Sequence, residues 1–115
     1  MIAGFVIQGD APKQLLIRAV GPILSGFGVG GVLADPQLTI YREGLTTPVQ
    51  QNDNWITANA GQIGLAAAQV GAFALPPNSR DAALVATFAP GTYTAQVSGV
   101  GNTTGVALVE IYEVL

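Results

Sequence analysis

Residues 82 to 98, Ala-Ala-Leu-Val-Ala-Thr-Phe-Ala-Pro-Gly-Thr-Tyr-Thr-Ala-Gln-Val-Ser, decide the fold because they have the pattern of two strands with a turn between them. Hydrophobic and polar residues alternate on both sides of the turn, so each strand has one hydrophobic face. If Ala89 stands opposite Thr92, a single antiparallel register places all the apolar residues on the same face. These residues are Leu84, Ala86, Phe88, Tyr93, Ala95 and Val97. The pattern therefore predicts a paired hairpin, but Pro90-Gly91 suits a type II turn, which leaves a wider loop or an arch between two sheets as alternatives.

Further strand patterns occur along the chain and are separated by turn residues. They cover residues 2 to 8, 14 to 20, 37 to 42, 48 to 52 and 105 to 113. The second of these is apolar on both faces except at Arg18, so we expect it to be central in a sheet and covered on both sides.

One stretch has helical spacing, at about residues 60 to 70, where Ile63, Ala66, Ala67 and Val70 would share a face. Asn59 before it and Gly71 after it are suitable capping residues. Short strands at regular spacing with one helix predict an all-β fold, an antiparallel jelly-roll-like β-sandwich of seven to eight strands. A length of 115 residues corresponds to a single domain over residues 1–115.

The chain is poor in charge. Charged residues make up 10% of it, compared with roughly 25% in ordinary soluble domains, and half of it is hydrophobic. A folded monomer of this size exposes roughly 5,900 Å², which leaves roughly one charge per 500 Å². Either neutral polar side chains cover the outside, or much of the surface is buried against other copies.

Composition also argues against several classes of function. Four cations and a net charge of −3 provide no basic patch for nucleic acid. The absence of cysteine and histidine removes disulfides, the common transition-metal ligands and the commonest general base, and no serine has an evident base beside it, so we expect no enzyme and no cofactor. No apolar run is long enough to span a bilayer. The N-terminus lacks the features of a signal peptide, so we expect a chain that is cytoplasmic, already processed or part of something longer.

Seven motifs together resemble a repeat domain of large secreted and surface proteins of environmental bacteria, which has no assigned activity. The motifs cover nearly the whole chain: Gly4-Phe5-Val6-Ile7-Gln8-Gly9, Leu16-Ile17-Arg18-Ala19-Val20-Gly21-Pro22, Asn52-Asp53-Asn54-Trp55, Gly71-Ala72-Phe73-Ala74-Leu75, Asp81-Ala82-Ala83-Leu84, Pro90-Gly91-Thr92-Tyr93-Thr94-Ala95 and Val109-Glu110-Ile111-Tyr112. The second half also looks like bacterial pre-peptidase C-terminal domains, which are jelly-roll sandwiches, some of them calcium-binding. Repeats of the first family usually begin one strand further upstream. This chain departs from that pattern by starting at Met1, so the resemblance implies that Met1 is an interior residue of a longer protein. It leaves open whether the domain is complete without a strand from a neighbour.

Two kinds of ligand site are compatible with the residues. Oxygen atoms of turn residues could bind Ca²⁺, although such side chains more often bond their own backbone. The candidates are Asp35, Asn52, Asp53, Asn54 and Asp81. Trp55 with Tyr41 or Tyr93 could stack on a sugar ring of a polysaccharide, although a single tryptophan more often packs in a core or at a corner.

Arg18 and Glu110 are the lone charges inside otherwise apolar strand patterns. Either one alone in a buried, apolar site would cost several kcal/mol, so a buried or interface pair between them is one hypothesis. The alternative is that each points outward.

These observations predict a non-catalytic extracellular or cell-surface structural subunit that assembles with copies of itself into a filament, tube or surface array. Strand pairing between copies would bury the apolar residues of the terminal strands, Phe5 and Ile7 or Val109 and Ile111. The alternative function is a calcium- or carbohydrate-binding accessory domain of a secreted protein, with its site at the corner formed by residues 52 to 55.

Overall fold

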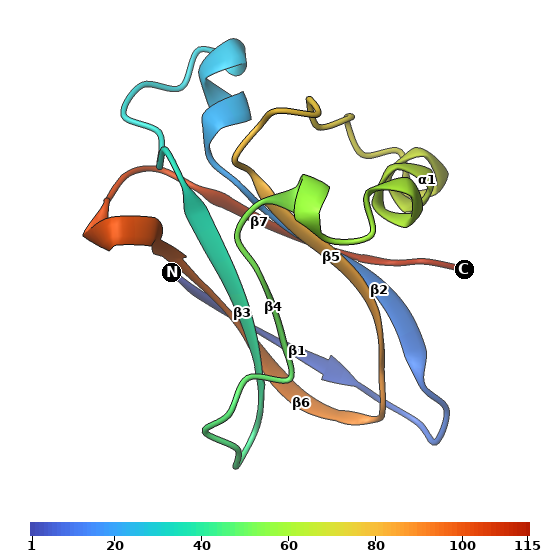
Figure 1. Cartoon of the computed structure of the whole chain (residues 1–115). Helices are drawn as coiled ribbons and strands as arrows, with labels where there is room; N and C mark the ends of the chain where they lie inside the picture. The colour runs from blue at the N-terminus through green and yellow to red at the C-terminus, as the bar shows by residue number, and fades with distance from the viewer.

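The computed structural model describes all 115 residues, and seven of its segments are strands in two antiparallel sheets (Figure 1). The four-stranded sheet contains, in spatial order, β1 (Ile2–Ile7), β6 (Gly91–Gly99), β3 (Pro36–Arg42) and β4 (Gln50–Asn52). The three-stranded sheet contains β5 (Ala82–Phe88), β2 (Lys13–Val20) and β7 (Leu108–Glu113). The chain is therefore an all-β sandwich, as the alternation predicts. Its seven strands are one fewer than the eight of a jelly roll.

The predicted hairpin pairing of residues 82 to 98 is wrong, because β5 and β6 lie in different sheets. β5 pairs with β2, whereas β6 lies between β1 and β3. The turn between them is an arch that crosses from one sheet to the other, which is the alternative that Pro90-Gly91 allowed. The six apolar residues of the two strands still contribute to one core, because they face each other across the sandwich. The rings of Phe88 and Tyr93, for example, meet edge to face at 5.2 Å between centroids.

β2 is the central strand of the three-stranded sheet, and both of its faces are covered, as its sequence predicts. Leu15, Ile17 and Ala19 point into the core between the two sheets. Leu16 and Val20 point the other way, into a second hydrophobic cluster on the outer face of the sheet. A strand that is buried on both faces must be apolar at nearly every position, which explains its unbroken hydrophobic run.

The second cluster is covered by α1 (Ala60–Val70), which lies against the three-stranded sheet on the side away from the other sheet (Figure 1). Its bounds agree with the predicted helix. The side chain of Asn59 accepts a hydrogen bond from the backbone N–H of Gln62 at 3.2 Å, and Gly71 ends the helix with a φ of 77°. Ile63, the first residue of the predicted apolar face, is buried against the sheet.

Three short 3₁₀ helices complete the secondary structure: Pro22–Phe27, Trp55–Thr57 and Val100–Asn102. None of the helices combines the length and the hydrophobicity that crossing a bilayer requires.

Candidate assembly interface

The two long sides of the sandwich differ in how they are closed. On one side, the side-chain oxygen of Asn52 in β4 accepts a hydrogen bond at 3.1 Å from the backbone N–H of Ala83 in β5, which ties one sheet to the other. On the opposite side, β1 and β7 are the sheet edges, and no hydrogen bond joins them. We call this opposite side, where β1 and β7 face each other, the open side.

Core-facing side chains are less well covered at the open side than elsewhere in the sandwich. Ile17, Leu38, Ile40 and Ala95, on the inner strands, are completely buried. The corresponding side chains at the open side pack against the same core but remain half-exposed. They are Phe5 of β1 with Val109 and Ile111 of β7. Hydrophobic side chains at this side are therefore partly exposed to water.

Phe5 is held firmly despite its exposure. Its ring stacks on that of Tyr93 at 5.2 Å with an angle of 11° between the planes, and it meets the ring of Phe88 edge to face at 5.7 Å. Ile7, two residues further along β1, is 6% exposed. Both are fixed by the core, so any partner at the open side would meet a rigid apolar surface.

Two of the predicted assembly residues of β1 meet one of β7 at a hollow of about 360 Å³. Phe5 and Ile7 line it from one sheet, and Ile111 lines it from the other. Lys13 and Glu113 also line it, and their side chains form an ion pair at 2.8 Å. The side chains that line the hollow are therefore mainly hydrophobic and carry no net charge.

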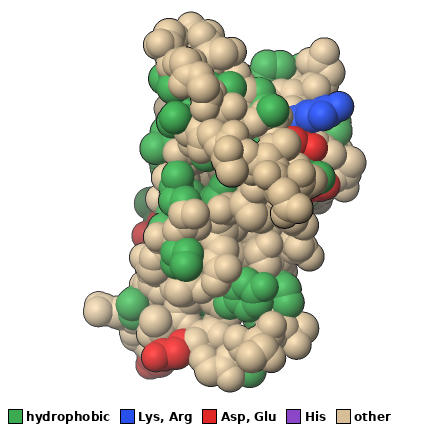
Figure 2. Space-filling model, turned by 90° about the vertical axis from the view of Figure 1, so that its left-hand side faces the viewer, with side chains coloured by type: hydrophobic (Ala, Val, Ile, Leu, Met, Phe, Trp, Pro, Cys, Tyr) green, Lys and Arg blue, Asp and Glu red, His purple; other side chains and the backbone are tan.

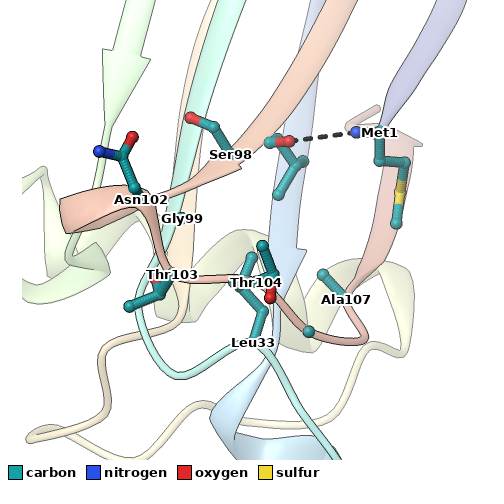
Figure 3. Close-up of a pocket in the computed structure, with 10 residues that line it drawn as sticks. Met1, Leu33, Ser98, Gly99, Asn102, Thr103, Thr104 and Ala107 are labelled. Atoms are coloured by element: carbon teal, nitrogen blue, oxygen red, sulfur yellow. Dashed lines mark hydrogen bonds between the residues drawn. The ribbon is translucent and has the colours of Figure 1, made fainter.

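A second hollow, of about 400 Å³, lies at the other end of β1 and is drawn in Figure 3. Met1 lies on one side of it, and Leu33, Thr104 and Ala107 lie below. Residues 102 to 107 form the segment that leads into β7. Hollows thus lie at both ends of β1, along the side where the sandwich lacks a closing contact.

The backbone of β1 has hydrogen-bonding groups that nothing in the chain satisfies. The amino group of Met1 donates to the Val97 carbonyl at 3.2 Å, and the Val97 N–H donates to the Met1 carbonyl at 2.9 Å. Such mutually bonded pairs alternate with non-bonded pairs along an antiparallel ladder. In the register of β1 with β6, Ile2, Gly4 and Val6 consequently direct their N–H and C=O groups away from β6 and toward the free edge.

The same alternation applies to β7. The Val114 N–H donates to the Gln14 carbonyl at 2.9 Å, which fixes the bonded pairs between β7 and β2. Val109 and Ile111 therefore direct their backbone groups away from β2. The open side has an unpaired row of donors and acceptors on each of its two strands.

Three of the candidate calcium ligands, Asn52, Asp53 and Asp81, have side-chain oxygen atoms that accept hydrogen bonds from the protein itself. Asp81 is completely buried, and its carboxylate accepts a hydrogen bond from the backbone N–H of Gly21 at 2.7 Å and another from the Ser79 hydroxyl. Asn52 is occupied with Ala83, as described above. A carboxylate oxygen of Asp53 accepts from the Asn54 side chain at 3.4 Å.

Asp35 has one carboxylate oxygen 3.9 Å from an Arg80 nitrogen, and its other carboxylate oxygen is buried without a hydrogen-bond partner. The structure contains no group of three or more acidic side chains arranged to hold a metal ion. Calcium binding stays a prediction that these contacts do not favour.

The candidate sugar-stacking residues do not share a surface. Trp55 is buried in the cluster beneath α1, and its indole N–H donates to the Pro76 carbonyl at 2.8 Å. Tyr93 is buried in the core between the sheets, and its hydroxyl donates to the Ala89 carbonyl at 2.7 Å. Tyr41, on β3, is half-exposed. Carbohydrate binding also stays a prediction, without a site that brings these rings together.

Arg18 and Glu110 form an ion pair, which is one of the two arrangements that the sequence left open. They are directly opposite each other on β2 and β7, and the Arg18 Nε donates to a Glu110 carboxylate oxygen at 2.8 Å. Two further partners escaped the sequence reasoning. The Phe73 carbonyl accepts from Arg18 Nη1 at 2.6 Å, and the Tyr112 hydroxyl donates to Glu110 at 2.8 Å. The alternation of β7 could have indicated Tyr112, which shares a face with Glu110, but nothing local indicates Phe73.

Sequence reasoning also missed the segment that closes the second hollow. Val32 and Val106 form a parallel bridge, and a side chain at Gly105 would collide with the backbone of Val32 at 2.6 Å. Glycine is therefore needed at position 105 for the two segments to approach each other.

Comparisons with protein-family models, with curated proteins and with solved structures found no match to this chain. The resemblance to a bacterial surface repeat domain stays a prediction.

Proposed function

We propose that this chain is a non-catalytic structural subunit, located outside the cell, that assembles with copies of itself through its open side. The observation that carries the proposal is the coincidence of half-exposed core side chains with unpaired strand edges. Phe5 and Ile111 line one hollow, and the backbone groups beside them on β1 and β7 have no partners. An exposed sheet edge of this kind is a template for pairing with another chain.

A strand from a second copy would both pair with the free backbone groups of the open side and cover its half-exposed hydrophobic side chains. Its backbone would pair with the outward groups of Ile2, Gly4 and Val6, or with those of Val109 and Ile111. Its side chains would cover the hollows and remove Phe5 and Ile111 from water. Because β1 and β7 are different surfaces, joining β1 of one copy to β7 of the next is a head-to-tail contact, which produces open filaments or rings.

The rest of the surface is compatible with close packing of copies. The chain has only eleven charged side chains for 6030 Å² of exposed surface, and two of them, Arg18 and Asp81, are buried, so electrostatic repulsion between copies is weak. Figure 2 shows one face on which neutral polar side chains and backbone predominate, with hydrophobic side chains in small separate patches. Neutral polar groups and backbone therefore cover much of this face, and the proposal depends on the open side rather than on the low charge.

Proline at position 6 tests the proposal, because it removes an outward N–H without removing a bond between β1 and β6. Val6→Thr is the matched control, since it changes the same exposed side chain and keeps the N–H. We expect wild type and Val6→Thr to form particles whose mass, measured by light scattering, grows with concentration. Val6→Pro should remain monomeric.

Circular dichroism and urea unfolding verify that Val6→Pro is folded. A wild-type chain that stays monomeric at every concentration contradicts the proposal. So does a folded Val6→Pro variant that assembles like the wild type.

A further inference from the structure

We propose that the chain has a second site, a pocket under α1 that binds a small, mostly apolar, neutral molecule through one carbonyl oxygen. The pocket has a volume of about 250 Å³, and seven of its nine lining residues are hydrophobic. Trp55, Ile63 and Leu75 form buried walls, and the small residues Gly64 and Ala68 of α1 form part of an exposed rim. This volume is below the roughly 300–1,000 Å³ of pockets for drug-sized ligands, so the ligand is small.

Arg18 is the one charged residue that lines the pocket, and its donors are incompletely satisfied. Its side chain is completely buried. Nε donates to Glu110 and Nη1 donates to the Phe73 carbonyl, and the guanidinium lies 4.3 Å from the centre of the Phe73 ring. Nη2 has no acceptor. Buried donors are nearly always paired, and Arg18 lines the pocket, so we infer that a bound ligand supplies the acceptor for its unpaired nitrogen.

The surroundings of Arg18 indicate that this acceptor is neutral. Glu110 already balances the arginine charge, and the Tyr112 hydroxyl donates to the second oxygen of that carboxylate. A second anion would bring an unbalanced negative charge into apolar surroundings, which is costly. A ketone or amide oxygen accepts from Nη2 without adding charge. An apolar body fits the walls that Ile63, Ala67 and Leu75 provide.

The proposed pocket is independent of the proposed assembly. It lies on the outer face of the three-stranded sheet with the second hydrophobic cluster, whereas the open side lies at the edges of β1 and β7. Either proposal can fail without the other.

Two ring compounds of similar shape test the pocket: cyclohexanone, which has a carbonyl oxygen, and methylcyclohexane, which does not. Trp55, the only tryptophan, provides a fluorescence signal at the pocket, and backbone NMR shifts of α1 provide a second. We expect saturable binding of cyclohexanone, with methylcyclohexane weaker by about tenfold or more, the effect of losing a hydrogen bond to a charged donor.

A matched pair of variants locates the binding. An added side chain meets no atom within 4 Å at either Gly61 or Gly64, but only Gly64 lines the pocket. Gly64→Leu should therefore block cyclohexanone, and Gly61→Leu on the same helix should leave it unchanged.

Four results overturn the proposal. Equal binding of methylcyclohexane means that the pocket is merely apolar, and tighter binding of cyclohexanecarboxylate means that it is an anion site. Undiminished binding to Gly64→Leu places the ligand elsewhere. If none of the probes binds, the pocket is not a ligand site, and water is the partner of Nη2.

Discussion

Asp81 illustrates how much a single buried side chain can hold together. It follows a surface loop, yet it is completely buried, and it connects the start of β5 to the end of β2 through its bond to the Gly21 N–H. Gly21 has no room for a side chain, because an added Cβ would lie 2.1 Å from the Leu33 carbonyl oxygen. The carboxylate and the glycine therefore fix the junction of three segments.

Replacing Asp81 by alanine should lower the free energy of unfolding by about 1–3 kcal/mol, since the Gly21 N–H would be left buried without an acceptor. Asp81→Asn keeps an acceptor oxygen in place and should cost less. Urea unfolding of the two variants measures the difference. Equal stability of Asp81→Ala and wild type, to within about 0.5 kcal/mol, would show that water replaces the carboxylate.

Tyr112 gives the chain a pH dependence in the alkaline range. Burial raises the pKa of its phenol above the ordinary value of 10.0, and the hydrogen bond to Glu110 and that residue's negative charge raise it further, while Arg18 lowers it. The folded chain thus holds the phenol proton more tightly than the unfolded chain does. Its stabilising contribution is present below pH 10 and is lost as the pH rises through the folded-state pKa.

We expect the free energy of unfolding to fall with pH above about 10 more steeply in wild type than in Tyr112→Phe. The other two tyrosines are common to both proteins, so the difference isolates Tyr112. Urea unfolding at a series of alkaline pH values measures it. Parallel curves for the two proteins would refute the assignment.

At the scale of elements, the sequence predicted which residues are buried better than it predicted which strands pair. Alternation in β5 and β6 correctly placed Leu84, Phe88, Tyr93 and Val97 in one core. It could not distinguish neighbours within a sheet from partners across the sandwich, since both arrangements direct the same residues inward. The helix was predictable because its caps and its period are local, whereas the partners of β6 are remote in sequence.

The Arg18–Glu110 pair couples β2 to β7, and a double-mutant cycle tests the coupling. Glu110→Leu leaves the completely buried Arg18 without its counter-charge and should cost about 3–5 kcal/mol, whereas Arg18→Met leaves the partly exposed Glu110, which keeps its bond from Tyr112, and should cost less. The double variant, with no charge left, should cost less than the two single changes together. Additive losses would mean that the two side chains do not depend on each other.

At the scale of the whole molecule, the low charge left open whether neutral polar groups or other copies cover the surface, and it did not indicate where copies would meet. The predicted assembly residues Phe5, Ile7, Val109 and Ile111 were chosen as apolar residues of terminal strands. The structure places these two strands at the same side of the sandwich. That placement depends on the order of strands in both sheets, and no local pattern of the chain contains it.

The candidate site was therefore predictable as a set of residues but not as a surface. The hollow at Leu33 and Ala107 forms because residues 31 to 33 approach residues 105 to 107, which are remote in sequence. For the calcium and sugar candidates, the residue types suggested ligand sites that the structure does not bring together. Asp81 and Trp55 are types found at ligand sites, but here they are buried with partners inside the fold.

Hydrogen exchange at the two free edges tests the assembly most directly, because it reports pairing at individual residues. The informative amides are those of Gly4 and Val6 on β1 and of Val109 and Ile111 on β7, which point away from their own sheets. The Phe5 amide, already paired with β6, is the internal control.

We expect exchange at the outward amides of both edges to slow by more than about tenfold when the protein concentration is raised from monomer to particles, with Phe5 changing little. Outward amides that exchange as fast in the particles as in the monomer would contradict assembly through the open side.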